Sequence, residues 1–287
     1  MLAIYKKEVK SYLTSMIGYV FIALLLLLAG IYFTAYNLNY GYPVFGYTLS
    51  SSTFVFLIVT PLLTMRVLAE EKKQKTDQLL LTSPVSIMKI VLGKYLAMVT
   101  VYLIPMIILC FYPIILSSFG TVSFKMAFAA LFGFFLLGCV NLVIGLFISS
   151  ITESQAIAAV LTFGILFLCY MVSNLESFIS TTAITSFLAF LLFLVVLCMV
   201  IYQMTKSALL SGGIGGIGGI ALLITYLVKS SIFEGAIQKL LSIFDITSHF
   251  TSFVDGIFDF TAVTYFVSVI VFGVFLTVQS IQKRRWS

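Results

Sequence analysis

The chain has 287 residues, a mean hydropathy of +1.18 and a formal net charge of +6 at pH 7. Hydrophobic residues make up 61% of it and charged residues only 9%, against about 25% charged residues in a soluble domain. This composition excludes a soluble enzyme. It predicts an all-α integral membrane protein, because apolar runs of about 20 residues match the hydrocarbon core of a bilayer.

Residues 1–15 are expected to form a helix at the membrane surface. Ile4, Tyr5, Val9, Tyr12 and Leu13 recur at helical intervals among lysines, which is typical of an interfacial helix on the inner leaflet. The apolar run that follows, 16–36, is longer than the hydrophobic region of a secretory signal and lacks a small-x-small cleavage site at its end. It therefore predicts a retained membrane span.

Eight apolar runs predict a polytopic bundle of about eight transmembrane helices. Their ranges are 16–36, 51–69, 96–116, 126–149, 156–174, 183–204, 211–228 and 262–281. With a cytoplasmic N-terminus, thirteen Lys and Arg residues fall inside and three outside, so the inside carries 13 − 5 = +8 and the outside 3 − 5 = −2. This asymmetry predicts two cytoplasmic termini. It also explains the positive charge without nucleic-acid binding.

A charged segment, 70–95, lies between the second and third runs. Seven charged residues occur between Arg66 and Asp77. Residues 69–81 can form a short helix in which Glu71 precedes Lys75 by four positions, the favourable order of an ion pair, and Pro84 stops it. Such a helix is suited to dock into a groove of a soluble partner. The alternative is a solvated loop that only sets the membrane topology. The predicted docking residues are Glu70, Glu71, Lys72, Lys73, Lys75, Thr76, Leu79, Leu80, Ser83 and Pro84.

The runs 183–204 and 211–228 are predicted to form a hairpin rich in glycine. Six glycines fall between Ser211 and Ile220. Glycine is unfavourable in an isolated helix, but small residues four positions apart let membrane helices pack closely. A phosphate-binding loop is excluded, because no Lys-Ser or Lys-Thr follows. The predicted helix-packing residues are Gly212, Gly215, Gly216 and Gly219.

The predicted extracellular loop, 229–261, carries apolar residues at the spacing of an amphipathic helix. They are Ile232, Phe233, Ala236, Ile237, Leu240, Leu241 and Phe244. Such a helix would lie at the outer interface or dip between spans. The single histidine, His249, lies near Asp245 and Asp255, but a membrane metalloprotease needs at least a second strong ligand close by, so a solvated loop histidine is expected.

No catalytic set is recognisable in the sequence. A phosphate-binding Gly-x-x-x-x-Gly-Lys-Ser/Thr run is missing, so the chain is not expected to hydrolyse ATP alone. The four cysteines lie within apolar runs and indicate neither a disulfide framework nor a metal site. Polar residues within the runs do not form the acid–base pairs expected of a proton relay.

Four stretches of the sequence resemble the permease family of type-2 ABC exporters, and within it the gliding-motility branch. They are Tyr5–Tyr12 with Ile17–Tyr19; Pro61–Arg66 continuing through Glu70–Lys73 and Leu79–Pro84 to Val91–Leu96; Gly145–Ser150; and Asp245–Phe266. The chain departs from the family in two places. Residues 183–228 add two spans to a core of six, and Lys75-Thr76-Asp77-Gln78 replaces a Gly-Thr-x-Glu stretch.

The resemblance implies that 1–287 is one permease domain in a bacterial-type plasma membrane. Such a permease couples ATP hydrolysis by a separate ATPase to export of a substrate or its extraction from the membrane. ATP and Mg²⁺ would then bind to the partner, and this chain would need no cofactor. The implied partners are two ATPase copies and a second permease, identical or homologous.

A different function is a membrane anchor or force-transmitting subunit of an ATP-driven secretion or motility assembly. That assembly would add a third subunit with a large extracellular domain. The sequence does not specify a substrate.

Overall fold

The computed structural model describes residues 1–76, 85–178, 180–205, 216, 219 and 222–286, and the elements assigned in them are all helical. The chain divides into two compact units. Unit 1 comprises Met1–Tyr170 and Ile246–Ser287, and unit 2 comprises Met171–Asp245.

Six helical segments among the described residues are long and apolar enough to cross a membrane. They are Met16–Asn39, Gly46–Lys73, Ile87–Ser117, Phe124–Ile151, Gln155–Val172 and Phe260–Lys283. They confirm an all-α polytopic membrane protein and correspond to six of the eight predicted spans. The predicted span 183–204 coincides with helix α11 (Ala183–Thr205). The predicted span 211–228 lies mostly outside the described residues, although 222–228 are helical.

Unit 1 begins with two helices that meet at an angle. Extended backbone at Ser15 (φ −96°, ψ 150°) separates α1 (Leu2–Thr14) from α2 (Met16–Tyr32), and a π-helical segment, η1 (Phe33–Asn39), continues α2. The second span consists of α3 (Gly46–Ser52), η2 (Thr53–Val55) and α4 (Phe56–Thr64), followed by the short helix α5 (Ala69–Lys73). The rest of the unit contains α7 (Ile87–Leu109), α8 (Tyr112–Ser117), α9 (Phe124–Ile151), most of α10 (Gln155–Phe178), α14 (Ser248–Val254) and α15 (Phe260–Trp286).

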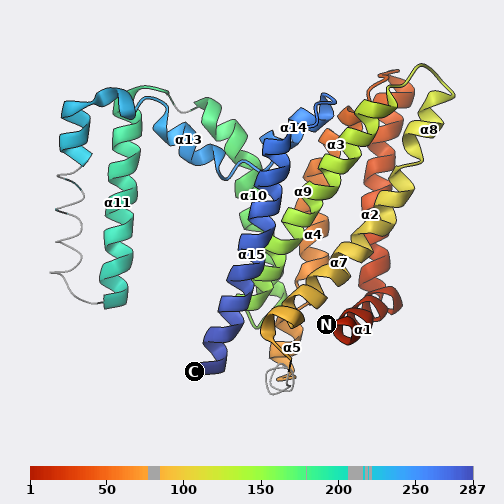
Figure 1. The fold of residues 1–287 in the computed structure, drawn as a ribbon, viewed down its shortest axis with the longest axis horizontal. Coiled ribbons are helices and arrows are strands. Elements are labelled where there is room, and N and C mark those ends of the chain that lie inside the picture. Colours follow the sequence, from red (N-terminus) through yellow and green to blue (C-terminus); the bar gives the residue numbers. More distant parts are fainter. Residues whose placement is uncertain (77–84, 179, 206–215, 217–218, 220–221, 287) are drawn as a thin grey trace. The chain divides into compact units, whose positions relative to one another are not determined.

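Helix α9 is the centre of unit 1, because α4, α7, α14 and α15 all pack against it (Figure 1). Two of its glycines permit this close packing. A Cβ atom added at Gly138 would overlap the ring of Tyr102, and one added at Gly145 would overlap the side chain of Thr64. The Tyr102 hydroxyl in turn donates a hydrogen bond of 2.8 Å to the carbonyl oxygen of Phe134. In the described part of the chain, α9 is thus one helix in which glycines let neighbouring helices pack closely.

The predicted glycine packing at 212–219 stays a prediction. Gly212 and Gly215 lie outside the described residues. Around Gly216 and Gly219, no described heavy atom lies within 4 Å of an added Cβ atom.

The predicted amphipathic helix in 229–261 is wrong in its extent. Gly235 has a φ of +67°, a left-handed conformation that interrupts the helix, and α13 covers only Ala236–Ser242. Further along, α14 buries Phe250 and Phe253 in the core of unit 1. The α14 part of the predicted exposed connection therefore contributes buried side chains to the core of unit 1.

Within unit 2, an aromatic cluster joins α11 to the segments that follow it. The rings of Phe187 and Tyr226 lie 4.8 Å apart, and Phe233 packs edge-on against both at 6.0 and 5.9 Å. These contacts place Tyr226 against α11, and the predicted hairpin 183–228 stays a prediction.

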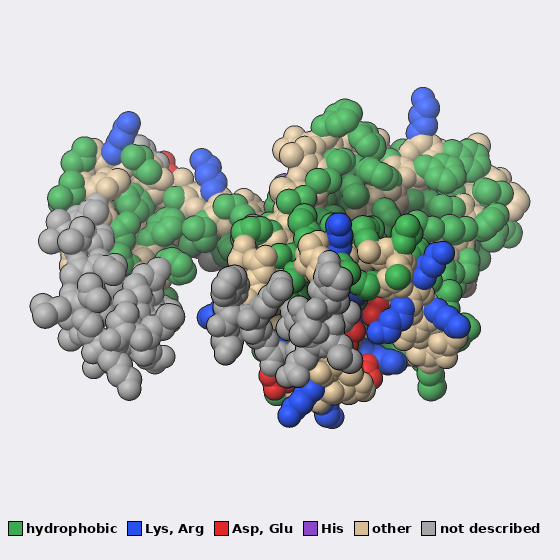
Figure 2. All heavy atoms as spheres, turned by 60° about the horizontal axis from the view of Figure 1, so that its bottom comes forward, with side chains coloured by type: hydrophobic (Ala, Val, Ile, Leu, Met, Phe, Trp, Pro, Cys, Tyr) green, Lys and Arg blue, Asp and Glu red, His purple; other side chains and the backbone are tan. Residues whose placement is uncertain are grey.

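Both termini of unit 1 lie at the same end as α5 (Figure 1). Figure 2, which turns this end forward, shows Lys and Arg side chains gathered there with Asp and Glu among them. We call this the charged end. It comprises α1, residues 65–76 and 85–94, and the C-terminal part of α15.

Candidate functional site: the α5 junction

Helix α5 is shorter than the sequence predicts. It ends at Lys73 because Lys75 adopts a left-handed conformation with φ of +56°. The backbone N–H of Lys75 donates to the carbonyl of Lys72 (3.1 Å) and that of Thr76 to the carbonyl of Glu71 (3.0 Å). This is the hydrogen-bond pattern of a Schellman motif, whose left-handed position is usually glycine.

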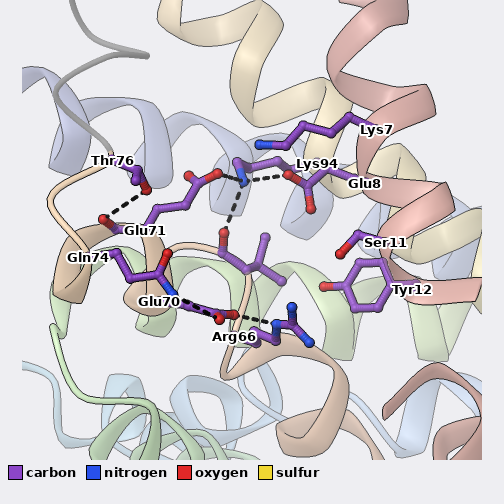
Figure 3. Close-up of a pocket in the computed structure, with 11 residues that line it drawn as sticks. Lys7, Glu8, Ser11, Tyr12, Arg66, Glu70, Glu71, Gln74, Thr76 and Lys94 are labelled. Carbon is purple, nitrogen blue, oxygen red and sulfur yellow. Dashed lines mark hydrogen bonds and ion pairs between the residues drawn. The ribbon is translucent and has the colours of Figure 1, made fainter. Parts of the chain in front are cut away.

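The ion pair predicted between Glu71 and Lys75 is not formed. Glu71 instead turns toward the first turns of α7 and meets Lys94, whose side chain is 1% exposed. The Lys94 ammonium donates to Oε1 of Glu71 (2.8 Å), to Oε1 of Glu8 (2.9 Å) and to the carbonyl oxygen of Val67 (3.0 Å). All three ammonium donors therefore have acceptors. Figure 3 shows Lys94 between the two carboxylates, which come from α1 and α5.

The other side of α5 is fixed to the end of α9. The hydroxyl of Ser149 accepts hydrogen bonds from the backbone N–H groups of Leu68 and Ala69, each of 3.1 Å. Ser149 therefore satisfies N–H groups at the start of α5 that have no partner within the helix. The Lys72 ammonium donates to the carbonyl oxygen of Ser150. The start of α5 and one of its side chains are thus held by two consecutive serines of the predicted family-like stretch 145–150.

Helix α1 packs against the bundle through one face. The hydroxyl of Tyr12 donates to the carbonyl oxygen of Leu63 at the end of α4 (3.1 Å), and the hydroxyls of Tyr5 and Thr100 lie 2.9 Å apart. Burial, and secondarily the negative charge of Glu8, raises the pKa of Tyr12, so its phenol stays a hydrogen-bond donor. The predicted surface helix is therefore also a structural part of the charged end.

A solvent-accessible pocket of about 250 Å³ lies between α1 and the α4–α5 connection. Its lining is mostly charged or polar: Lys7, Glu8, Ser11, Tyr12, Arg66, Val67, Glu70, Glu71, Gln74, Thr76 and Lys94. On one wall, Arg66 forms an ion pair with Glu70, and Gln74 donates to the same carboxylate at 3.3 Å. The pocket has room for a protruding side chain of another protein. It offers three acidic and three basic groups, all three acids already being paired.

The structure separates the predicted docking residues into two groups. Glu71 and Lys72 face the bundle and hold α5 in place, and Glu70 is half-buried beside Arg66. The predicted residues Lys73, Lys75 and Thr76 are exposed, as is Gln74, which was not among the predicted docking residues. Leu79, Leu80, Ser83 and Pro84 lie outside the described residues.

The roles of Lys94, Ser149 and Glu8 were not predicted from the sequence. Lys94 falls in the charged segment 70–95, whereas α7 begins at Ile87 and carries Lys94 in its second turn. The signal available was a lysine directly after Gly93. A Cβ atom added at Gly93 would lie 3.4 Å from the Ile4 side chain, in ordinary contact distance, so α1 packs against α7 directly beside Lys94.

Nothing in the described part of the chain gathers three or more His, Cys, Asp or Glu side chains in an arrangement that could hold a metal ion. His249, expected to be a solvated loop residue, lies on α14. Its ring stacks on that of Tyr265 with 4.0 Å between centroids.

Residues 36–183, just over half of the chain, match the protein family described as ABC-2 family transporter protein. The matched region runs from η1 to the first residue of α11 and contains α5, Lys94 and Ser149. No curated protein matches the chain.

Proposed function

The chain belongs to the ABC-2 family of transporter proteins, and from this premise we propose that it couples ATP hydrolysis by a partner to the export of a substrate or its extraction from the membrane. Family membership and the membrane-spanning helices make it a multi-pass permease subunit of an ABC transporter, which works with an ABC ATPase subunit. ATP and Mg²⁺ bind to that partner in this proposal. The permease contributes the membrane path and the contact through which it is driven.

The α5 junction is the observation that supports this proposal most. A docking element that transmits movement has to be held firmly by the spans that it moves. Helix α5 is tied to α1 and α7 through Lys94 and to α9 through Ser149 and Ser150. Its end nevertheless exposes 73–76. A push on α5 would therefore act on several helices of unit 1 at once.

ATP can drive this permease only if the bound ATPase dimer favours one of two arrangements of the spans. A partner with equal affinity for both arrangements would shift neither population. In the proposed mechanism, closing of the ATPase dimer moves α5, and Lys94 carries α1 and the start of α7 along with it.

We assign the charged end to the cytoplasm. Lys6, Lys7, Lys10, Lys73 and Lys89 are all exposed there, and an excess of Lys and Arg marks the cytoplasmic side of membrane proteins. A soluble ATPase would reach α5 from that side. Both termini are then cytoplasmic, in a bacterial-type plasma membrane.

The composition of the complete assembly is a finer proposal. By its resemblance to the gliding-motility branch, the chain would pair with two ATPase copies and a second permease. A third subunit with a large extracellular domain would indicate a force-transmitting assembly instead of a transporter. Mass spectrometry of the complex purified through a tag on this chain distinguishes the two compositions.

The docking proposal is tested by removing the exposed end of α5 while leaving its anchors in place. We expect the variant Lys73→Ala, Gln74→Ala, Lys75→Gly, Thr76→Ala to fold, because these side chains are exposed and glycine suits the left-handed position. It should lose the co-purifying ATPase and the ATP turnover of the reconstituted complex. The matched control is Thr121→Ala, Lys125→Ala, which changes exposed residues before and at the start of α9. Full retention of the ATPase by the α5 variant, with normal turnover, would show that α5 is not the docking element.

A further inference from the structure

Building on the proposed function, we propose that the exposed end of α5, residues 73–76, presents a basic surface and that the ATPase surface it contacts is acidic. From the sequence, 70–75 contains two glutamates and three lysines and could attract either charge. The fold determines the sign of the exposed charge, because it turns some of these side chains toward the bundle and leaves others exposed.

The acidic side chains of α1 and α5 are all engaged within the chain. Glu8 and Glu71 share the ammonium of Lys94 at 2.9 and 2.8 Å, and their side chains are only 13% and 15% exposed. Glu70 is paired with Arg66. A partner approaching α5 therefore meets carboxylates that are already paired with cations of the chain itself.

The basic side chains at the end of α5 are oriented differently. Lys72 is turned inward to the carbonyl oxygen of Ser150, but Lys73 and Lys75 are exposed. The left-handed conformation at Lys75 ends the helix and leaves this residue at its outer tip. Gln74 and Thr76, also exposed, add hydrogen-bonding groups without charge. The surface offered by 73–76 thus carries two positive charges and no negative charge.

A protein fits this surface better than a membrane does. Basic helices that lie on anionic lipid carry apolar side chains beside their lysines. Helix α1 has this combination, because Leu2 and Leu13 are 72% and 36% exposed among the exposed residues Lys6 and Lys10. No apolar residue occurs in 73–76. The lysines of α1 therefore suit a membrane surface and those of α5 an acidic protein surface.

The experiment measures binding of the purified ATPase subunit, identified by co-purification with the full chain, to the permease in nanodiscs of neutral phosphatidylcholine. Charge reversal by Lys73→Glu, Lys75→Glu should weaken binding about tenfold in 50 mM NaCl, because two attractions become repulsions. The difference between variant and wild type should shrink in 500 mM NaCl, where exposed charges are screened. The control Lys125→Glu, at another exposed lysine, should bind as the wild type does.

Three results would overturn the inference. They are equal binding by wild type and Lys73→Glu, Lys75→Glu; tighter binding by that variant; or an effect that appears only in nanodiscs containing anionic phosphatidylglycerol, which would assign these lysines to lipid. If the reversal impaired folding, the neutral variant Lys73→Gln, Lys75→Gln should still show about threefold weaker binding. Failure of any ATPase to bind the wild type would refute the proposed function instead.

Discussion

Lys94 is the residue on which α1, α5 and α7 converge. A buried ammonium is tolerated when acceptors surround it, and here two carboxylates and one carbonyl oxygen do so. The arrangement fixes α5 because removal of the cation would leave two largely buried carboxylates without the cation that they share. Substitutions of Lys94, Glu8 and Glu71 should therefore act mainly by lowering the stability of the protein.

We predict that Lys94→Met lowers the free energy of unfolding by about 3–5 kcal/mol, the usual effect of removing one partner from a buried ion pair. The measurement is thermal unfolding of the purified chain in detergent. Lys89→Met, at an exposed lysine of the same helix, is the control and should change little. Equal melting temperatures for wild type and Lys94→Met would contradict the role given to this residue.

Substitution of Lys75 by glycine is expected to raise stability, whereas Lys94→Met is expected to lower it. A left-handed conformation costs a residue other than glycine about 1–2 kcal/mol. Lys75→Gly should therefore stabilise the end of α5, seen as slower amide hydrogen exchange at Thr76, while removing one exposed charge. Faster exchange in the variant would show that the turn is held by the lysine side chain and not by its backbone.

The sequence predicted that residues 70–76 are important, but not which of their side chains face the bundle and which are exposed. The order Glu71 to Lys75 favoured a local ion pair. The fold offered Glu71 a more buried cation from a residue 23 positions away, and nothing local in the sequence encodes that pairing. The replacement of a family glycine by Lys75 was visible, but its meaning depended on knowing that the helix ends there.

Among the elements, α9 organises unit 1 through its glycines. Gly145→Ala should destabilise the protein by about 1–3 kcal/mol, because the added methyl group would overlap Thr64 and force α4 away. Gly164→Ala in α10 is the matched control, since no atom lies within 4 Å of an added Cβ atom. That substitution should be neutral or stabilising by up to about 1 kcal/mol. Similar losses of thermal stability in both variants would mean that helix propensity and not packing decides the effect.

The spans were predictable as elements because their apolar runs are long. Their ends were less predictable. The third span begins at Ile87, whereas the sequence predicted residue 96. The predicted start was too late because Lys89 and Lys94 lower the local hydropathy, although the helix continues through them. The segment 229–261 was predicted to be one exposed connection, although α14 packs into the core. Apolar residues have the same helical spacing whether they face lipid or a protein core, so the sequence does not distinguish the two.

For the whole molecule, the proposed topology places the charged end in the cytoplasm. In a parent protein whose four cysteines are replaced by alanine, Tyr40→Cys and Thr251→Cys should react with a membrane-impermeant maleimide in intact cells, since both residues are exposed. Gln74→Cys should react only after the membrane is opened. Labelling of Gln74→Cys in intact cells would invert the topology and exclude a cytoplasmic partner at α5.

Site-directed crosslinking shows directly whether the exposed end of α5 contacts the ATPase. Gln74→Cys, in the same cysteine-free parent, is coupled to a short photoactivatable maleimide and irradiated in the purified complex. We expect a crosslinked product of permease and ATPase from Gln74→Cys and none from Lys125→Cys. Crosslinking from Lys125→Cys but not from Gln74→Cys, in a complex that still turns over ATP, would contradict the proposed contact.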